Sequence, residues 1–457
     1  MAGYSSSSYN LTSYEELFFN MTIEEKARTA AFLNHLLNEK LEFKRCQDEV
    51  EDIKQSTQEC LELFCSTLGK LNPAFKVGRV FPVGSMAEGT RIVEPSEFDF
   101  IVALKEWSGN VDVKRITHAG GWIRKRFKHE EALQTFPVVK QEHALIKFPN
   151  KEGYKGNSDI CAFLDKANGS FWDYKHYEKK IFTNAFEACK EVRIEKSSGI
   201  MMFNGSPDFH GPVYSVEIMW KPKNDHSPSL KVDVDIAPAI FVEDVRKVFS
   251  EKDVYGLSER NTKKILEVNS FLLMPARKCF ESMMHYQFAF TNTEVELIQQ
   301  LSETHKNCIK LLKFFFRDHT VISSFILKTC VLIHSGNCDS KDSEYECLFD
   351  VLKVLVRGLP ILDKKVGGRL GFCNLFMDSN LIQQRLYEPV EVNRIRQYML
   401  DIMTTLIEIG KHTSPNSFNV GYARCKSLTR AESKQDEKQP YTTEDSIIDA
   451  GMYKLRM

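Results

Sequence analysis

Two pairs of acidic residues stand two positions apart in apolar, strand-like segments. Glu97 and Asp99 lie in a run rich in phenylalanine, valine and isoleucine, and Asp233 and Asp235 alternate with valines. Residues i and i+2 of a strand point to the same side, so each pair presents two carboxylates on one face. Carboxylates on a rigid element suit Mg²⁺, a hard ion that takes oxygen ligands and shares them with substrate phosphates. The spacing therefore predicts a divalent-metal site.

A glycine-serine bend precedes the first acid pair. The apolar run 76–83 has strand composition and stops at Gly84. Without a Cβ, Gly84 lets the backbone approach a phosphate, and the Ser85 hydroxyl and the following amides can donate to it. A Gly-Ser turn or an E-x-D strand alone is more often an ordinary turn or a solvated face. In this order and spacing, however, they match the nucleotidyltransferase signature, which also requires a third acid.

Several motifs, in order along the chain, resemble those of one family. The first three motifs are G-S-x-x-E-G-T from Gly84, E-F-D from Glu97 and V-D-I-A-P-A from Val234. They resemble motifs of the cyclic GMP-AMP synthase-like receptors, which are animal enzymes related to cyclic GMP-AMP synthase. The segments 308–313 and 323–329 are similar to two motifs of that family's C-terminal lobe. By this resemblance the third metal ligand is Asp235, with Asp233 as second choice.

The resemblance implies an α+β, bilobal nucleotidyltransferase fold: a catalytic lobe with a mixed β-sheet, a long spine helix and a helical C-terminal lobe. The expected divisions are a mobile leader (1–20), the spine helix region (21–75), the nucleotidyltransferase core (76–250), the helical C-lobe (251–420) and a disordered tail (421–457). Composition and periodicity predict strands at 76–83, 97–104, 138–148, 213–220 and 230–236, and helices from Thr22 onward and at 171–190, 293–316, 323–334 and 344–357. After residue 250 we expect helices rather than strands.

The resemblance also implies roles for particular residues. Glu97, Asp99 and Asp235 would be catalytic and would hold two Mg²⁺ (or Mn²⁺) ions. The implied nucleotide-binding residues are Gly84, Ser85, Glu97, Asp99, Asp235, Lys310, Ser324 and Phe325. Lys310 is assigned to the donor triphosphate, although a helical lysine is usually a solvated side chain. Ser324, in the first turn of its helix, favours an anion or is a plain capping residue, and Phe325 stacks on a base or belongs to the core.

The implied function is a ligand-activated nucleotidyltransferase. It would join ATP and GTP into a cyclic GMP-AMP-like dinucleotide that activates STING in innate, antiviral immunity, and double-stranded RNA would be the trigger. Two other interpretations share the motifs. One is a catalytically inactive nucleotide-binding adaptor of the same fold, and the other is an oligoadenylate or poly(A) polymerase.

A basic cluster is the candidate nucleic-acid-binding surface. It comprises Lys114, Arg115, Arg124, Lys125, Arg126 and Lys128, with no acid between the first and the last. Such a run is usually a solvated face, but it can also meet an RNA backbone, with the duplex recognised by shape.

The sequence departs from the family in two places. The best-known relative has a zinc-binding His-Cys-Cys insertion before the lysine helix, whereas the span 280–306 has no adjacent cysteines, and Cys279, His285, His305 and Cys308 fit no known finger spacing. Gln287 also stands where the family has a base-reading arginine. We therefore expect neither that zinc site nor the same choice of bases.

Composition limits which other classes of protein the chain can belong to. The 457 residues include 61 Lys and Arg against 62 Asp and Glu, so nucleic-acid binding would depend on local patches. No apolar run is long enough to span a membrane, and the 12 cysteines lie without C-x-x-C pairs. We expect a cytoplasmic protein with reduced thiols that assembles, if at all, on its ligand.

Overall fold

The computed structural model forms two compact units. The helical unit comprises residues 1–42, 301–372 and 381–440, and the sheet unit comprises residues 43–300, 373–380 and 441–457. The residues that the structure describes are 16–108, 112–118, 122–125, 134–137, 141–147, 171–210, 213–224, 227–244, 263, 266–275, 285–317, 322–338, 343–358, 373–374, 377–380, 389–412 and 418–427. The predicted leader (1–20) therefore lies largely outside them, as does most of the predicted tail (421–457).

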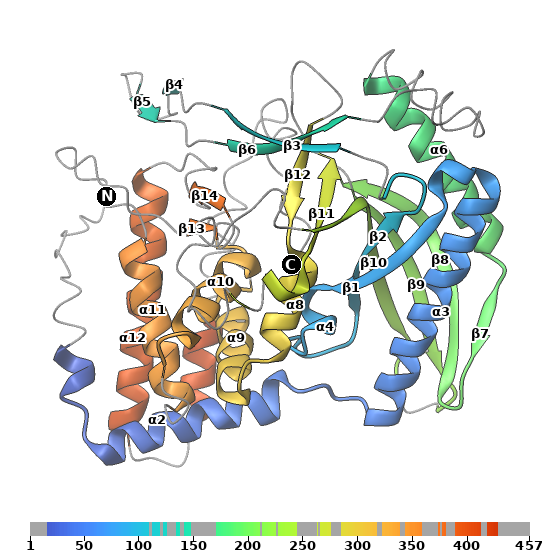
Figure 1. Cartoon of the computed structure of the whole chain (residues 1–457). Coiled ribbons are helices and arrows are strands. Elements are labelled where there is room, and N and C mark those ends of the chain that lie inside the picture. The colour runs from blue at the N-terminus through green and yellow to red at the C-terminus, as the bar shows by residue number, and fades with distance from the viewer. Residues whose placement is uncertain are drawn as a thin grey trace, which may run out of the picture. The chain divides into compact units, whose positions relative to one another are not determined.

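The sheet unit is built on one ten-stranded sheet (Figure 1). Its order is β3-β6-β12-β11-β10-β9-β8-β7, with β2 beside β10 and β1 beside β2. The bounds are β1 (Val77–Val83), β2 (Glu97–Leu104), β3 (Asp112–His118), β6 (Gln141–Lys147), β7 (Arg193–Glu195), β8 (Gly199–His210), β9 (Val213–Pro222), β10 (Leu230–Glu243), β11 (Ser270–Pro275) and β12 (His285–Ala289). Because β2 and β10 are parallel while β1/β2 and β9/β10 are antiparallel, the sheet is mixed.

The long strand β10 changes partners along its length. Its pairing with β9 ends at Ile236, and its pairing with β11 begins at Ile240. Pro238 falls between these two positions, while the other edge of β10 stays paired with β2. Since proline has no backbone N–H to donate, this is a place where a central strand tolerates it. Pro238 is therefore compatible with the change of β10 from pairing with β9 to pairing with β11.

One face of the sheet is covered by α3 (Gln47–Leu71) and α6 (Phe171–Cys189), which pack on each other and on β8. Trp220 is fully buried there, and its Nε1 donates to Glu49 Oε1 of α3 at 3.0 Å. The same carboxylate pairs with Arg45 at 2.5 Å, and Arg45 Nε reaches Glu94 Oε2 at 3.0 Å. A buried charge needs such partners to offset its desolvation. This network fixes α3 to the segment that precedes β2.

The other face of β2 and β10 has an acidic end and an apolar end. Beyond the acids, Ile101, Ala103, Ala237 and Ala239 form a buried cluster with Val295 of α8 (Thr291–Gln299). Helix α8 is also tied to the short helix α4 (Gly84–Ala87), because a Gln299 side-chain N–H donates to the Ala87 carbonyl at 2.8 Å. The apolar cluster and α8 therefore stabilise the part of β2 and β10 next to the acids.

The helical unit consists mainly of α2 (Ile23–Leu36), α9 (Glu303–Phe316), α10 (Ser324–Ser335), α11 (Glu344–Gly358) and α12 (Pro389–Lys411). Thr22 caps α2 in a full capping box with Glu25, at the position where the sequence predicted the helix to begin. The Thr29 hydroxyl donates to the Leu406 carbonyl at 3.1 Å, joining α2 to α12.

The sheet unit also contains two small two-stranded sheets: β4 (Trp122–Lys125) with β5 (Gln134–Pro137), and β13 (Cys373–Asn374) with β14 (Met377–Asn380).

The predicted α+β class with a mixed sheet and a helical lobe is confirmed, but three predicted details are wrong. The helix expected through 21–75 is interrupted: α2 ends in a π-helical turn (Leu37–Leu41), and α3 begins only at Gln47. The helix expected at 293–316 is two helices, since Ser302 caps a new one. Strands β11 and β12 appear where only helices were expected, because a short run that is apolar throughout, such as that of β11, carries no period that separates strand from helix.

The described helices include none that is both long and apolar enough to cross a membrane.

Candidate active site

The two predicted acid pairs lie side by side on adjacent strands. In the parallel pairing of β2 with β10, Asp233 is opposite Glu97 and Asp235 is opposite Asp99. Neighbouring strands are about 4.8 Å apart, and residues in register point to the same face. The four carboxylates, named the acidic face below, therefore come from one small area of one sheet.

Burial distinguishes the two candidates for the third acid. Asp99 is 2% exposed and Asp235 is 9% exposed, whereas the Asp233 side chain is 52% exposed. Asp233 also lies 3.5 Å from the Lys231 ammonium, which Glu217 contacts at 2.5 Å. The hydrogen bond that Lys231 donates to Glu217 and the negative charge of Asp233 raise the pKa of Lys231. Asp235 is thus the better partner for Asp99, and Asp233 belongs to a solvated ion-pair group.

The predicted glycine-serine bend lies directly against the acids. Gly84 has φ +71°, and a Cβ built on it would be 1.9 Å from Asp99 Oδ2. Only glycine combines this left-handed conformation with so close an approach. Ser85 follows in α4 and is 3% exposed. The structure therefore places Gly84, the first residue of α4, directly against Asp99 of the acidic face.

Arg91 was missed by the sequence analysis. Its Nη1 pairs with Glu97 Oε2, and its Nη2 donates to Ser96 Oγ at 2.9 Å. Its Nε donates to the Glu94 carbonyl at 3.1 Å. In the sequence Arg91 is one basic residue in a short connection, and no spacing marks it. This cation offsets one of the negative charges of the acidic face.

The acidic face fits a hard divalent cation. Its donors are carboxylate oxygens, the set that Mg²⁺ and Mn²⁺ prefer. Like charges on neighbouring in-register positions oppose folding unless a cation lies between them. Because Gly84 has no Cβ, Asp99 Oδ2 lies directly against its backbone, where any other side chain would overlap the carboxylate. Glu97, Asp99 and Asp235 are the residues that would hold the ions.

The other predicted nucleotide-binding residues belong to the helical unit. Lys310 is half-buried on α9, and Ser324 is the first residue of α10, after the capping residue Ser323. Ser324 Oγ is buried and makes no hydrogen bond within the described residues. Phe325 is half-buried. Their roles in binding a nucleotide stay predictions.

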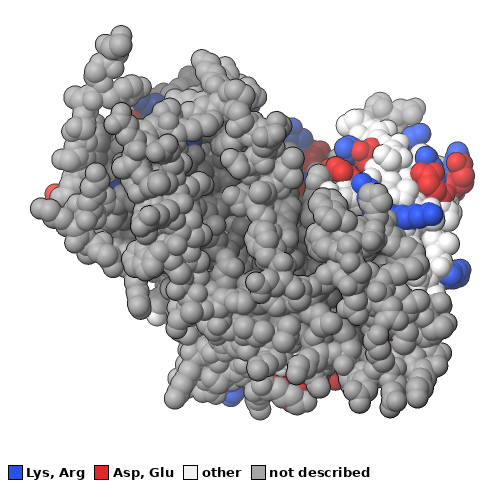
Figure 2. Space-filling model, turned by 90° about the horizontal axis from the view of Figure 1, so that it is seen from above, with Lys and Arg blue, Asp and Glu red and all other residues white. Residues whose placement is uncertain are grey.

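The predicted basic cluster is divided between elements. Lys114 and Arg115 belong to β3 of the large sheet, and Arg124 and Lys125 belong to β4 of a two-stranded sheet. Arg126 and Lys128 lie outside the described residues. On the described surface visible in Figure 2, basic and acidic side chains are interspersed. Nucleic-acid binding by the cluster stays a prediction.

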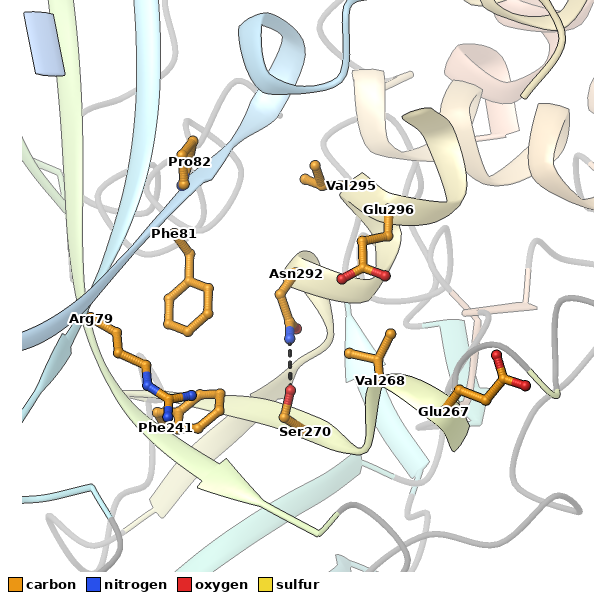
Figure 3. A pocket seen from close by; sticks show the side chains of 10 residues that line it. All are labelled: Arg79, Phe81, Pro82, Phe241, Glu267, Val268, Ser270, Asn292, Val295 and Glu296. Carbon is orange, nitrogen blue, oxygen red and sulfur yellow. Dashed lines mark hydrogen bonds between the residues drawn. The ribbon is translucent and has the colours of Figure 1, made fainter. Parts of the chain in front are cut away.

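A separate cavity of about 460 Å³ lies in the sheet unit between β1, β10 and α8 (Figure 3). Its wall contains Arg79, whose guanidinium lies 4.4 Å from the centre of the Phe241 ring and pairs with Glu243 at 3.2 Å. Asn292 Nδ2 donates to Ser270 Oγ at 3.0 Å across it (Figure 3). The described residues that line this cavity include none of the acidic face.

Comparisons with known proteins give little direct help. No protein-family model matches the chain, and no curated protein matches it. Among solved structures, the chain is similar to the structure described as the E. coli MS115-1 CdnC:HORMA-deltaN complex. Sequence identity is 11%, the match covers 88% of this chain and 97% of that chain, and the TM-score is 0.48. A likeness at this level supports no conclusion about the site, and it gives no support for the animal family that the motifs resemble.

Proposed function

We propose that the chain is a metal-dependent nucleotidyltransferase. The observation that carries the proposal is the meeting of three sequence motifs: Gly84 lies against Asp99, and Asp99 is in register with Asp235. Bound Mg²⁺ or Mn²⁺ would offset the charge of a triphosphate and of the leaving pyrophosphate.

The residues of the chain have distinct parts in this reaction. A hydroxyl oxygen of one nucleotide forms a bond to the α-phosphorus of a second, the bond from that phosphorus to the pyrophosphate oxygen breaks, and pyrophosphate leaves. Asp235 accepts the hydroxyl proton, while Glu97 and Asp99 would hold the ions that offset the charge of the donor triphosphate. The backbone at Gly84 and Ser85 admits a phosphate close to the acids.

The finer proposal follows the resemblance. ATP and GTP are the substrates, a cyclic dinucleotide that acts on STING is the product, and double-stranded RNA is the activator. The proposal that RNA is the activator rests on the basic cluster of the sequence. Lys310, Ser324 and Phe325 are proposed as further nucleotide contacts.

The test is a product assay with the full chain. Labelled ATP and GTP are incubated with Mg²⁺ or Mn²⁺, with and without duplex RNA, and the products are identified by mass spectrometry. We expect pyrophosphate and a phosphatase-resistant cyclic product, and a loss of roughly 10³-fold or more in Asp99→Asn, which corresponds to several kcal/mol of barrier. Asp233→Asn is the matched control and should stay active.

Other outcomes identify the competing functions. Linear products longer than a dinucleotide would show that the enzyme is a polymerase and not a cyclic dinucleotide synthase. Nucleotide binding with no turnover, unchanged in Asp99→Asn, would contradict the enzyme and favour the adaptor.

A further inference from the structure

Four potential metal ligands converge in the helical unit. His305, His334, Cys338 and Cys347, named the His/Cys cluster below, have ligand atoms that all lie within 4.8 Å of one another. Of these, only His305 is among the four residues considered from the sequence. Cys308 is fully buried but is not part of the cluster, and Cys279 lies outside the described residues.

Three packed helices bring the cluster together. His305 stands in the first turn of α9, and His334 stands in the last turn of α10. Cys338 follows the end of α10, and Cys347 lies in the first turn of α11. Helices α9, α10 and α11 all pack on one another. The ligands therefore come from elements whose packing already holds them in place.

Two of the separations between ligand atoms match the edges of a tetrahedron around one ion. With Zn–S near 2.3 Å and Zn–N near 2.0–2.1 Å, tetrahedral geometry places two sulfurs about 3.8 Å apart and a sulfur and a nitrogen about 3.6 Å apart. Here Cys338 Sγ and Cys347 Sγ are 3.6 Å apart, and Cys347 Sγ is 3.8 Å from His305 Nε2. Neither cysteine forms a disulfide, and their separation is far beyond a covalent S–S bond of about 2.05 Å.

A hydrogen bond orients one ligand. Ser302 Oγ, the cap of α9, lies 2.8 Å from His305 Nδ1, the ring nitrogen that faces away from the cluster. Histidines that bind metals through one nitrogen commonly donate the other N–H to such a partner, which fixes the tautomer and ring orientation. With Nδ1–H donating to Ser302, the lone pair of Nε2 is directed at Cys347 Sγ.

Burial of the four side chains suits a structural site. Cys347 is fully buried and His305 is 5% exposed, whereas His334 and Cys338 are half-buried. The buried Cys347 and His305 keep water away from the site, and the half-buried His334 and Cys338 leave an entry path for an ion. Two thiolates and two neutral imidazoles also balance the charge of Zn²⁺, and four protein ligands leave no position open for a substrate.

We propose that His305, His334, Cys338 and Cys347 bind one structural Zn²⁺ ion that fastens α9, α10 and α11 together. The ion occupies a closed Cys₂His₂ site, distinct from the oxygen-donor site of the acidic face. Metal binding to this set stabilises the folded helical unit, because the unfolded chain does not hold the four ligands together.

The first test uses the intact protein. The full chain is purified under reducing conditions and its metal content is measured, after which zinc is replaced by Co²⁺. We expect about one zinc per chain and, with Co²⁺, tetrahedral absorption bands accompanied by thiolate-to-cobalt charge transfer. The charge-transfer band separates this site from the acidic face, which has no thiolate. Reduced protein that retains no zinc and shows no such band would overturn the proposal.

The second test uses matched cysteine variants. Cys338→Ala removes a half-buried ligand, and Cys330→Ala removes a fully buried cysteine of α10 outside the cluster. We expect Cys338→Ala to lose most of the bound zinc and to weaken the charge-transfer band, while Cys330→Ala retains both. Equal retention in the two variants would contradict the assignment, as would a Cys338–Cys347 disulfide that persists in reductant.

Discussion

The acidic face and the His/Cys cluster are two ligand sets built in different ways. The acids stand two residues apart on each of two strands, and strand register alone brings them together. In the cluster, Cys347 and His305 are 42 residues apart and meet only because helices pack. The chemistry differs as well: the first set offers hard oxygen donors, and the second offers sulfur and nitrogen donors. The comparison teaches that two ligand sets in one chain can be distinguished by their donor atoms and by the kind of contact, strand register or helix packing, that brings them together.

Among the variants that test the difference between the two ligand sets, Gly84→Ala should have the largest effect. A Cβ there collides with Asp99, so the variant should lose metal binding and turnover at the acidic face while its zinc content is unchanged. The control is Gly89→Ala, because Gly89 has φ +72° and nothing within 4 Å of its Cβ position. Both variants lose about 1–2 kcal/mol from the left-handed backbone. Measured Mn²⁺ binding should separate them, and equal binding would contradict the close fit of Gly84 and Asp99.

A smaller effect is expected at the other site from Ser302→Ala. Removing the hydroxyl that orients His305 should weaken zinc affinity roughly 10–100-fold, as measured by competition with a chelator. The loss of the α9 cap also costs about 1 kcal/mol, which Ser323→Ala on α10 controls for. Turnover per zinc-loaded chain should be little changed. If Ser323→Ala weakens zinc binding as much, the orienting role of Ser302 is wrong.

The smallest effect is expected from Arg91→Ala. The Arg91–Glu97 pair is partly buried, so its loss should lower the melting temperature of metal-free protein by the equivalent of about 1 kcal/mol. Added Mg²⁺ should then raise the melting temperature more than it does in the unchanged protein, because Glu97 no longer has a competing cation. Thermal unfolding with and without Mg²⁺ checks this. An equal rise in both proteins would show that Arg91 does not compete for the site.

The sequence patterns predicted the acidic face more completely than the His/Cys cluster. Period-2 alternation in β2 and β10 reports which residues share a face, and Gly84 marks the bend before them. Their register, and hence the choice of Asp235 over Asp233, required the resemblance or the structure. No periodicity links His305 with His334, Cys338 and Cys347, since tertiary packing alone joins them. Similarly, Arg45, which precedes α3, pairs with the distant Glu94, and Arg91 pairs with Glu97 only because of the path of the connection between them; no periodicity reports either contact.

The most direct test of the central claim compares two acids on the same strand. Asp235→Asn and Asp233→Asn make the same chemical change two residues apart in β10, and the measurement is Mn²⁺ binding together with nucleotide consumption by the full chain. We predict that Asp235→Asn loses both activities, whereas Asp233→Asn, whose side chain is solvated and paired with Lys231, retains them. Full metal binding and turnover in Asp235→Asn would contradict the proposed active site.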